Sequence, residues 1–422
     1  MKHKKKPKGS VVAALDIGST KIACFIARII DDEGNYNVLG VGHQAALGIK
    51  SGRVVDMGAA EAAIRHTVHT AENMAADALK GFPLRDVVVN VSGNLANSFS
   101  YNVDVQVSGQ EITDNDVRRA LAKAQDEAYA DDTELIHTIP IGYRIDGNDG
   151  IKEPRGMYGD VLEVNTHLVT SDVSSLRSMA SCVESSHLDI EALCLSSYAA
   201  GLACLVEDEM DLGATVIDMG GGTTSISVFN GGNMIFSDAV LLGGQHVTTD
   251  IAKGLTTSIA SAERLKNLYG HAMGGTTDGS EMIDVPQLGE DHQGQVNHVP
   301  RSLLIGIIQP RLEEILELVR AKMEMSGLGT HLGRRVVLTG GASQLHGLRE
   351  LSQHVLNKQV RLGMPIRTSG LPDAVNGPAF STTAGLLTYL SERSDEMPAE
   401  ILAQVEPASA WERVKFWLRE NW

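Results

Sequence analysis

The sequence predicts an α/β protein of two lobes, with an inserted α+β subdomain and a C-terminal amphipathic helix. Three observations predict this class. Apolar strand segments alternate with helical segments along most of the chain, which is typical of sheets covered by helices. A strand, a glycine turn and a second strand occur twice in the same order, in residues 11–28 and 213–232. The last twelve residues carry an apolar stripe at helical spacing.

The later of the two hairpins is the richer in glycine. Its sequence, GATVIDMGGGTTSISVFNGG, reads as two strands joined by a polar turn. Asp218 ends the first strand, and the glycines at 220–222 leave backbone N–H groups open to a phosphate chain. A carboxylate beside such an anion indicates a divalent cation between them, held by oxygen ligands or water. A glycine-rich hairpin without any ligand is the alternative for this copy alone.

The earlier hairpin, VVAALDIGSTKIACFIAR, repeats the pattern in residues 11–28. Asp16 ends its first strand, Gly18 follows, and the chain then resumes an extended apolar pattern. Lys21 adds positive charge to a phosphate site, or is simply an exposed strand lysine. Neither hairpin runs into a helix through the Gly-Lys-Ser/Thr ending of a P-loop.

Two facing hairpins that each bring one aspartate to a phosphate group resemble the phosphate clamp of the actin-fold ATPases. That superfamily includes actin, DnaK-type chaperones and sugar kinases. The resemblance implies an actin-like two-lobed ATPase fold and the cofactors ATP and Mg²⁺, with Asp16 and Asp218 holding the metal through water. The hairpin residues that it implies for nucleotide binding are Asp16, Gly18, Ser19, Thr20, Lys21, Asp218, Gly220, Gly221, Gly222, Thr223 and Thr224.

Two more segments match the actin fold. A helix expected at 257–269 carries Glu263 and Lys266 on one face, where the resemblance implies contacts to the nucleoside; a solvated ion pair is the alternative. The strand expected at 335–339 runs into the turn TGGAS, whose missing side chains let a flat base lie against the backbone. With a glycine turn before the helix near residue 246, these segments add Gly243, Gly244, Glu263, Lys266, Gly340, Gly341 and Ala342 to the expected nucleotide site.

Composition limits the possible partners and compartments. The chain has 422 residues, of which 43% are apolar, enough for two or three cores. A net charge of −17 argues against nucleic-acid binding, which needs clustered Lys and Arg. The exception is MKHKKKPK at residues 1–8, which we interpret as a solvated basic arm. No apolar run is typical of a signal peptide or reaches transmembrane length, so we expect the folded body in the cytoplasm.

The pattern of residues 87–165 predicts a small α+β module between the two hairpins. Short strands alternate there with one helix, at about 114–129. The segment EPRGMYGDVLEVNTHLVT, residues 153–170, resembles the inserted subdomain of the FtsA family of bacterial cell-division proteins. In that family the subdomain replaces one found in actin.

Two later segments carry weaker predictions. Residues 271–298 are glycine-rich, polar and aperiodic, so we expect a flexible surface loop. Residues 302–325 are helical in pattern, but Pro310 removes an amide donor and is expected to kink the helix or to begin a new one.

The last twelve residues, WERVKFWLRENW, contain all three tryptophans. They follow an acidic linker at 392–408, rich in proline and alanine. An apolar face flanked by basic side chains predicts a helix lying in the plane of a membrane. Packing of the same stripe on the protein's own core is the alternative. The residues expected to bind the membrane are Trp411, Val414, Lys415, Trp417, Leu418, Arg419 and Trp422.

The resemblance to the FtsA family spans nearly the whole chain, because the inserted module and the amphipathic helix occur together with the actin-fold turns. It implies an ATP-binding protein that polymerises through actin-like contacts and is a peripheral protein on the cytoplasmic side of the inner membrane. There it tethers FtsZ at the division site, through the FtsZ C-terminal tail, and recruits later division proteins through the inserted subdomain. By the same resemblance the FtsZ tail docks near residues 256–301.

The resemblance also divides the chain into subdomains. The first lobe takes 11–86 with 166–206 and 370–391, and the inserted module takes 87–165. The second lobe has a large part, 207–255 with 302–369, and a small part, 256–301. The basic tail (1–10), the linker (392–408) and the membrane helix (409–422) complete the expected division.

One departure from the actin-fold ATPases concerns hydrolysis. These enzymes position the attacking water with a Gln or Glu just before the second hairpin, where this chain has IEALCLSSYAAG. Only Glu191 is acidic there. We therefore expect ATP binding with weak or no hydrolysis, and we assign no catalytic residue.

Three other protein classes remain open. A pilus-assembly adaptor of the PilM type shares the inserted module but does not explain the amphipathic helix. An actin-fold small-molecule kinase needs a catalytic aspartate in the cleft between the lobes, and the sequence offers no sugar-site pattern. A shape-determining actin such as MreB has a different insertion.

Overall fold

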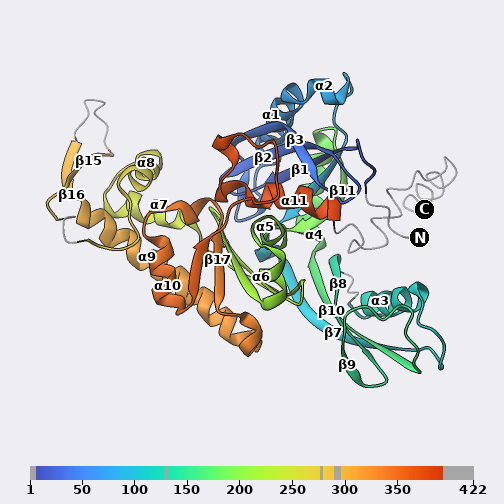
Figure 1. Ribbon diagram of the computed structural model, residues 1–422. Coiled ribbons are helices and arrows are strands. Elements are labelled where there is room, and N and C mark those ends of the chain that lie inside the picture. Colours follow the sequence, from blue (N-terminus) through green and yellow to red (C-terminus); the bar gives the residue numbers. More distant parts are fainter. Residues whose placement is uncertain (1–5, 129–131, 276–278, 289–295, 393–422) are drawn as a thin grey trace.

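The structure is a computed structural model that describes residues 6–128, 132–275, 279–288 and 296–392. Two lobes lie side by side, with the inserted module extending from them on one side and a small helical subdomain on the other (Figure 1). The expected membrane helix, nearly all of the linker and the first half of the basic tail lie outside the described residues. Those sequence predictions are therefore not tested by the structure.

The first lobe is built on a five-stranded sheet in the order β11-β6-β1-β2-β3. β1 is its centre; six of its seven residues are buried, as expected for a strand covered on both faces. β1, β2 and β3 form an antiparallel meander, while β6 and β11 add to β1 in parallel. The strand bounds are β1 (Val11–Ile17), β2 (Lys21–Ile29), β3 (Tyr36–Ala45), β6 (Asp86–Val91) and β11 (Asp189–Leu195).

The second lobe repeats this sheet with the same topology, in the order β14-β13-β12-β17-β18. A meander is again followed by two parallel strands. The repeated hairpins seen in the sequence are thus the first two strands of each sheet. The strand bounds are β12 (Ala214–Met219), β13 (Thr224–Asn230), β14 (Asn233–Val240), β17 (Arg335–Thr339) and β18 (Gln359–Leu362).

β6 lies in the first-lobe sheet, whereas the sequence division placed residues from 87 onward in the inserted module. Ala14 pairs with Val88, and Val89 pairs with both Leu15 and Leu193. The strand is fully apolar and buried from Val87 to Val89, as a strand between two parallel neighbours should be. The module therefore begins after this strand.

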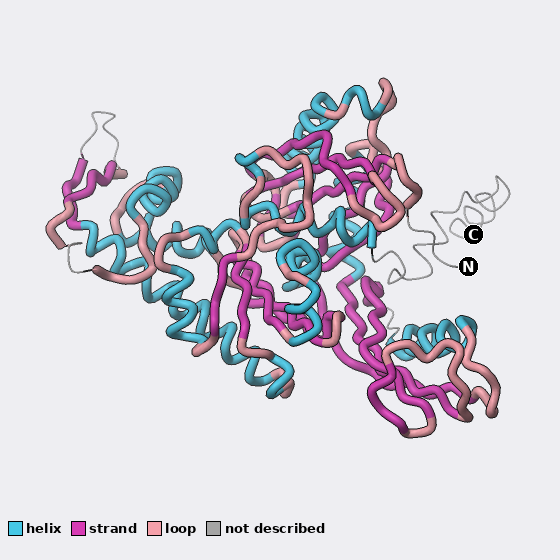
Figure 2. Tube along the Cα trace, in the orientation of Figure 1, coloured by secondary structure: helices cyan, strands magenta, loops and turns pink. Residues whose placement is uncertain are grey.

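The inserted module is a four-stranded antiparallel sheet, β7-β10-β8-β9, with one helix on it (Figure 2). Its elements are β7 (Ala96–Gln106), α3 (Asp114–Ala128), β8 (Thr133–Ile145), β9 (Asn148–Ile151) and β10 (Val161–Asp172). The hydroxyl of Ser98 donates to the carbonyl of Ser237 at 2.7 Å and accepts from its N–H at 3.1 Å, which joins β7 to β14 of the second lobe.

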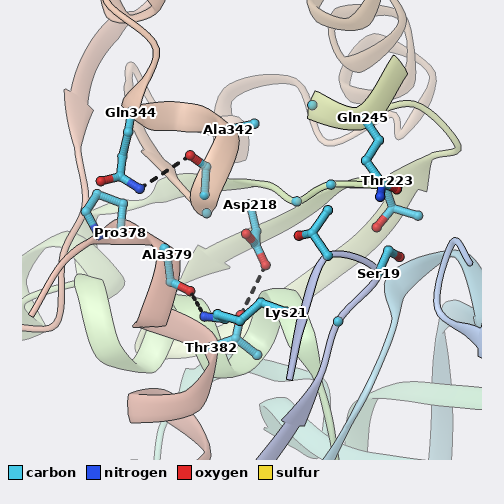
Figure 3. Close-up of a pocket in the computed structure, with 18 of the residues that line it drawn as sticks. Ser19, Lys21, Asp218, Thr223, Gln245, Ala342, Gln344, Pro378, Ala379 and Thr382 are labelled. Carbon is cyan, nitrogen blue, oxygen red and sulfur yellow. Dashed lines mark hydrogen bonds between the residues drawn. The ribbon is translucent and has the colours of Figure 1, made fainter. Parts of the chain in front are cut away.

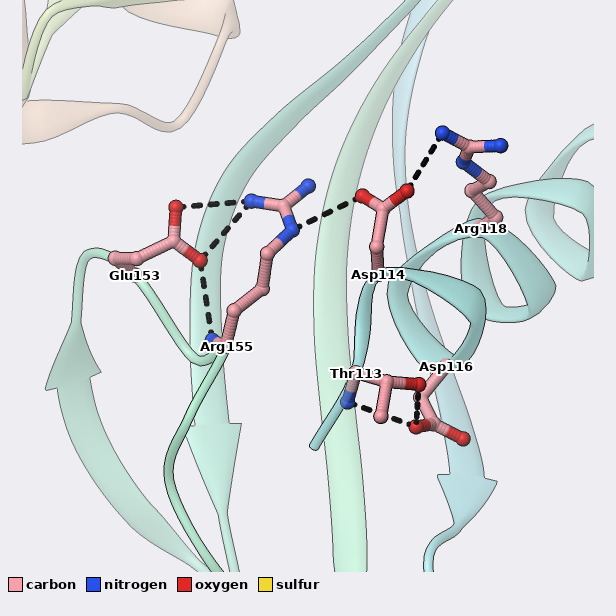
Figure 4. A network of polar contacts seen from close by, with 6 residues as sticks. All are labelled: Thr113, Asp114, Asp116, Arg118, Glu153 and Arg155. Atoms are coloured by element: carbon pink, nitrogen blue, oxygen red, sulfur yellow. Dashed lines mark hydrogen bonds and ion pairs between the residues drawn. The ribbon is translucent and has the colours of Figure 1, made fainter. Parts of the chain in front are cut away.

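A polar network fastens the start of α3 to the loop before β10 (Figure 4). Arg155 donates to Asp114 at 3.1 Å and to Glu153 at 2.8 Å, and Asp114 also pairs with Arg118 at 2.6 Å. All four side chains are well exposed, so the network orders the loop and adds little stability.

The small subdomain differs from the sequence prediction at residues 271–298. Its α8 (Ile259–Tyr269) faces an antiparallel pair, β15 (Met282–Pro286) and β16 (Val296–Pro300), where we expected only a loop. Ile283 and Val285 of β15 are buried, which is the apolar alternation that a short half-buried strand requires.

The remaining helices cover the sheets. They are α1 (Met57–Met74), α2 (Ala76–Leu79), α4 (Val173–Ser185), α5 (Ser196–Cys204), α6 (Glu207–Leu212), α7 (Gly244–Gly254), α9 (Arg301–Met325), α10 (Leu348–Leu356) and α11 (Ser381–Glu392), and β4 (Ile49–Lys50) pairs with β5 (Arg53–Val54). Pro310 lies inside the continuous α9 and does not begin a new helix. None of the helices in the described ranges is long and apolar enough to cross a bilayer.

α11 and α5 pack unusually closely in the first lobe. Both are buried along their lengths, and both are rich in small residues. A Cβ atom at Gly385 would overlap the backbone carbonyl of Ala199, so only glycine permits this helix crossing. The position of α11 matters because its first turn lies in the cleft between the lobes.

We predict that Gly385→Ala destabilises the protein by about 1–3 kcal/mol through overpacking. The control is Gly306→Ala in α9, where a Cβ meets no atom within 4 Å. Replacing that helical glycine should stabilise by about 0.5–1 kcal/mol. Urea unfolding of both variants tests the prediction, and equal stability would show that the close helix crossing is misassigned.

Candidate functional site

A cavity of about 520 Å³ lies between the lobes and has the size of a small-molecule site. Its walls come from both hairpin turns, from α7 and α8, from the turn after β17, and from the segment before α11 (Figure 3). Elements that are far apart in the sequence thus converge on one space. Most of the residues expected to bind nucleotide line it.

The two hairpin turns are structurally equivalent. In the first, the N–H of Gly18 donates to the carbonyl of Lys21 at 2.9 Å, and in the second the N–H of Gly220 donates to the carbonyl of Thr223 at 2.9 Å. Each turn follows its strand-end aspartate by the same number of residues. Asp16 and Asp218 therefore occupy corresponding positions in the two lobes, and both line the cavity.

The glycines of the second turn let the two turns meet. A Cβ at Gly221 would overlap the side chain of Thr20, and one at Gly222 would lie 2.8 Å from the hydroxyl of Ser19. The first turn contributes side chains here and the second contributes bare backbone. The sequence interpretation gave these glycines a role toward phosphate only, and the structure adds this close contact between the lobes.

Each aspartate accepts a hydrogen bond from the start of α11. Thr383 donates to Asp16 at 3.0 Å, and Thr382 donates to Asp218 at 3.2 Å (Figure 3 labels Thr382 and Asp218). Because the two threonines are adjacent, one helical turn holds a carboxylate from each lobe. Asp16 is only 7% exposed, so these hydroxyls replace water that burial has removed.

Burial disfavours the charged forms of both carboxyl groups. It raises the pKa of Asp16, against the opposing effects of Lys21 and the Thr383 hydrogen bond. Burial and the nearby charge of Asp16 raise the pKa of Asp218 to about 6, against the effects of Thr382 and Lys21. Burial thus opposes ionisation of both carboxyl groups, and a charge on Asp16 further opposes ionisation of Asp218.

Lys21 is the cation nearest to this pair. Its ammonium group donates to the carbonyl of Ala379 and lies 3.7 Å from the ring centre of Phe380. Burial lowers the pKa of Lys21, while the charges of Asp16 and Asp218 act to raise it. With one lysine against two aspartates, the floor has a deficit of positive charge when all three are ionised.

A second polar group lines the other end of the cavity. Glu263 accepts from Lys266 at 2.7 Å and from Thr248 at 2.5 Å, and Lys266 also donates to the carbonyl of Gly244 at 3.2 Å. Burial opposes ionisation of Glu263, but the hydrogen bonds from Lys266 and Thr248 lower its pKa overall. The structure therefore shows the ion pair, and both residues line the cavity, while their contact with a nucleoside stays a prediction.

Two expected site residues do not line the cavity. Thr224 is buried and its hydroxyl donates to the carbonyl of Leu242 at 2.8 Å. Gly243 packs against the second turn, where a Cβ would lie 2.6 Å from the carbonyl of Gly220. Both residues support the second hairpin turn without facing the cavity. The other nucleotide-site residues named from the sequence all line the cavity.

The sequence interpretation missed several lining residues. Their local sequence carries no ligand motif, since they are ordinary residues near strand ends and helix starts. Asn90 accepts from the N–H of Ile17 at 2.7 Å and so braces the first turn. The missed residues include Asn90, Ser196, Gln245, Gln344, Ala379 and Thr382.

The polar groups that line the cavity fit a polyphosphate with a divalent cation. The deficit of positive charge beside Asp16 and Asp218 suits a cation, and the bare backbone of Gly220–Gly222 suits phosphate oxygens. Within the described ranges no group of three or more His, Cys, Asp or Glu side chains could hold a metal by itself. A cation here would need water or the ligand for the rest of its coordination.

Glu191 does not line the cavity. It is buried on β11 and forms an ion pair with Lys6. The lining residues before the second hairpin include Ser196 but no carboxylate or amide side chain from β11. Glu191 therefore cannot position water in this cleft.

Two duplicated sheets that enclose a cleft between glycine hairpins define an actin-like fold. Solved structures agree: the chain is similar to the PilM-PilN type IV pilus biogenesis complex, with a TM-score of 0.62 and 17% identity over 90% of this chain and 98% of that one. It is similar to MreB5 of Spiroplasma citri bound to ADP, with a TM-score of 0.51 and 13% identity over 95% of this chain and 100% of that one. The expected fold class is confirmed.

Sequence relatives define the family. The cell division protein FtsA of Rhizobium meliloti (strain 1021) is 42% identical over 97% of this chain and 95% of its own length. The family model "Cell division protein FtsA" matches residues 215–385, and "SHS2 domain inserted in FTSA" matches residues 93–170, which begins after β6. The chain belongs to the FtsA family, and is thus an actin-like cell-division protein, as the sequence predicted.

We predict that Asp218→Asn stabilises the protein in the absence of ligand. A pKa raised from 3.8 to about 6 means that ionisation costs the folded state about 3 kcal/mol at pH 7. This cost grows as the pH rises from 3.8 to about 6 and is constant above that. The stabilisation by Asp218→Asn should therefore be about half as large near pH 5 as at pH 7. Urea unfolding at both pH values measures it. A gain that increases on acidification would contradict the buried repulsion.

Proposed function

We propose that the chain binds Mg²⁺-ATP in the cleft, polymerises, and tethers FtsZ to the cytoplasmic face of the inner membrane at the division site. The observation that carries the nucleotide part is the pair of Asp16, which is buried, and Asp218, which is half-buried, beside two glycine turns with a deficit of positive charge. Membership of the FtsA family supports the proposed polymerisation and the proposed tethering of FtsZ to the membrane at the division site. Recruitment of later division proteins is proposed to occur through the inserted module.

In this proposal the phosphates bind between the two hairpin turns, near Ser19, Thr20 and Gly220–Gly222. Asp16 and Asp218 hold the hydrated cation, and Lys21 turns from Ala379 toward the phosphates. The cation neutralises phosphate charge when it is bound. Glu263 and Lys266 bind the nucleoside, and the turn Gly340–Ala342 offers backbone to the base. MreB5, with the same fold, has been solved with ADP bound, which supports the choice of ligand.

We propose that hydrolysis is weak or absent. The acidic residues that line the cavity within the described ranges are Asp16, Asp218 and Glu263. The first two accept hydrogen bonds from threonines and are assigned to the cation, and the third is paired with Lys266. None of them is left to orient an attacking water.

The same observations weigh against a small-molecule kinase, which needs a free carboxylate for the substrate hydroxyl. Identity of 42% to a cell-division protein, against 17% to the pilus-complex structure, favours the division role over that of a PilM-type adaptor. An MreB-type role is disfavoured by the inserted module that the FtsA-specific model matches.

The membrane part of the tether is proposed from residues outside the described ranges. The amphipathic stripe Trp411–Trp422 would bind the membrane, and the small subdomain near 256–301 would bind the FtsZ tail. Vesicle sedimentation with FtsZ, using the full chain and a chain ending at Ala408, tests whether residues after Ala408 connect FtsZ to the membrane. FtsZ should sediment only with the full chain.

We predict that Asp218→Ala lowers the affinity for ATP by about tenfold or more in the presence of Mg²⁺, because the carboxylate holds the cation. Circular dichroism should stay unchanged, since the residue belongs to the cavity floor and not to an apolar core. Asp77→Ala on the exposed face of α2 is the control. Unchanged ATP affinity in a titration would rule out the site.

We predict that Trp417→Glu abolishes vesicle binding without lowering the melting temperature. The charge would enter the hydrocarbon boundary and offset most of the few kcal/mol of attachment. Phe416→Glu, on the opposite side of the helix, is the matched control and should matter less. A lower melting temperature with intact vesicle binding would instead place the stripe on the protein's own core.

A further inference from the structure

Residues 378–383, which lead into α11 and form its first turn, are fastened to the first lobe. The ring of Phe380 stacks on that of Phe25 in β2, with 5.9 Å between the ring centres. Thr383 is buried and donates its hydroxyl hydrogen to Asp16 at the end of β1, at 3.0 Å. An apolar contact and a polar contact thus hold this segment against the sheet of the first lobe.

The same segment also contacts the second lobe, at the end of β17. The N–H of Gly340 donates to the carbonyl of Pro378 at 3.1 Å. The hydroxyl of Thr339, which is fully buried, donates to the hydroxyl of Ser381 at 2.8 Å. Residues of the first lobe are therefore held at a fixed position against the turn that follows β17.

Both carboxylate oxygens of Asp218 lie against this junction. Thr382 donates to Oδ2 at 3.2 Å (Figure 3), and Oδ1 lies so close to Gly340 that a Cβ on that residue would be 2.3 Å from it. Gly340 has a φ of +87°, which also favours glycine. The carboxylate is thus contacted on one oxygen by the first lobe and on the other by its own lobe, and these contacts set its orientation toward the cavity.

We infer that Thr382 is a positioning residue for the divalent cation, because it orients the carboxylate of Asp218 from the opposite lobe. The inference rests on the proposed binding of Mg²⁺-ATP in the cleft. Thr382 acts through Asp218 and is not assigned to the cation itself. Hydrogen-bond partners that orient a metal-binding side chain typically change metal affinity by about 10- to 100-fold when they are removed.

A purely structural role for the hydroxyl of Thr382 is the competing explanation, and α11 offers a matched comparison. Thr388 is also buried on this helix, and its hydroxyl shares a hydrogen bond with that of Tyr36 at 2.9 Å. Thr382 lines the cavity and its partner is a carboxylate, whereas Thr388 does not line the cavity and its partner is a phenol. Loss of either hydroxyl removes a buried hydrogen bond, but only the loss at Thr382 affects a group proposed to hold the cation.

The test is the affinity of the full chain for ATP, titrated once with excess Mg²⁺ and once with EDTA. Thr382→Val replaces the hydroxyl by a methyl group of similar volume. It should weaken binding about tenfold or more with Mg²⁺ and leave binding in EDTA unchanged. Thr382→Ser keeps the hydroxyl and should restore the Mg²⁺-dependent affinity. Thr388→Val should bind like the wild type in both conditions, even where its melting temperature falls.

The outcomes separate this inference from the proposed function. If the wild type binds ATP more tightly with Mg²⁺ and Thr382→Val does so equally, the inference is wrong and the cation site stands. An equal loss in both conditions would show that Thr382 serves the nucleotide or the fold, which also overturns the inference. If the wild type binds ATP no better with Mg²⁺ than with EDTA, the cation site is wrong and the inference fails with it. Should Thr382→Val not fold, as judged by circular dichroism, Thr382→Ala removes the same hydroxyl without adding a methyl group in its place, and the same outcomes apply.

Discussion

Two like charges buried at one cavity floor are the constraint on which the site depends. Asp16 comes from the first lobe and Asp218 from the second, and burial raises the pKa of both carboxyl groups. The opposing groups are one lysine and two threonine hydroxyls. A protein that keeps such a pair gives up stability in the absence of ligand, which is characteristic of sites made for a charged ligand.

The duplicated sheets explain why the aspartates face each other. Each lobe places a meander first and two parallel strands after it, so that each strand-end aspartate reaches the same edge of its sheet. The two turns are nevertheless unequal. Ser19 and Thr20 fill space that Gly221 and Gly222 leave open, and identical turns with side chains on both sides would not fit.

α11 links the cleft with the edge from which the linker departs. Its first turn binds both carboxylates, and its last residue, Glu392, pairs with Arg367 at 3.2 Å. The absence of a side chain at Gly385 lets α11 pack closely against α5. α11 is about 18 Å long and so reaches from the carboxyl groups at the cavity floor to the edge of the first lobe where residue 393 follows.

Local patterns in the sequence determined the hairpins, the TGGAS turn and the FtsA-like order of segments, because strand–glycine–strand signals act over a few residues. Tertiary structure alone decided three other features. An apolar run such as Val87–Val89 suits any buried strand, so its place in the first sheet depended on long-range pairing. The contact that demands Gly221 involves a turn on the other lobe. Thr382 and Thr383 meet aspartates 164 and 367 residues away, and no periodicity along the chain encodes hydrogen bonds over such separations. Thr383 meets Asp16 through the packing of the first lobe, and Thr382 meets Asp218 only because the second lobe lies against the first.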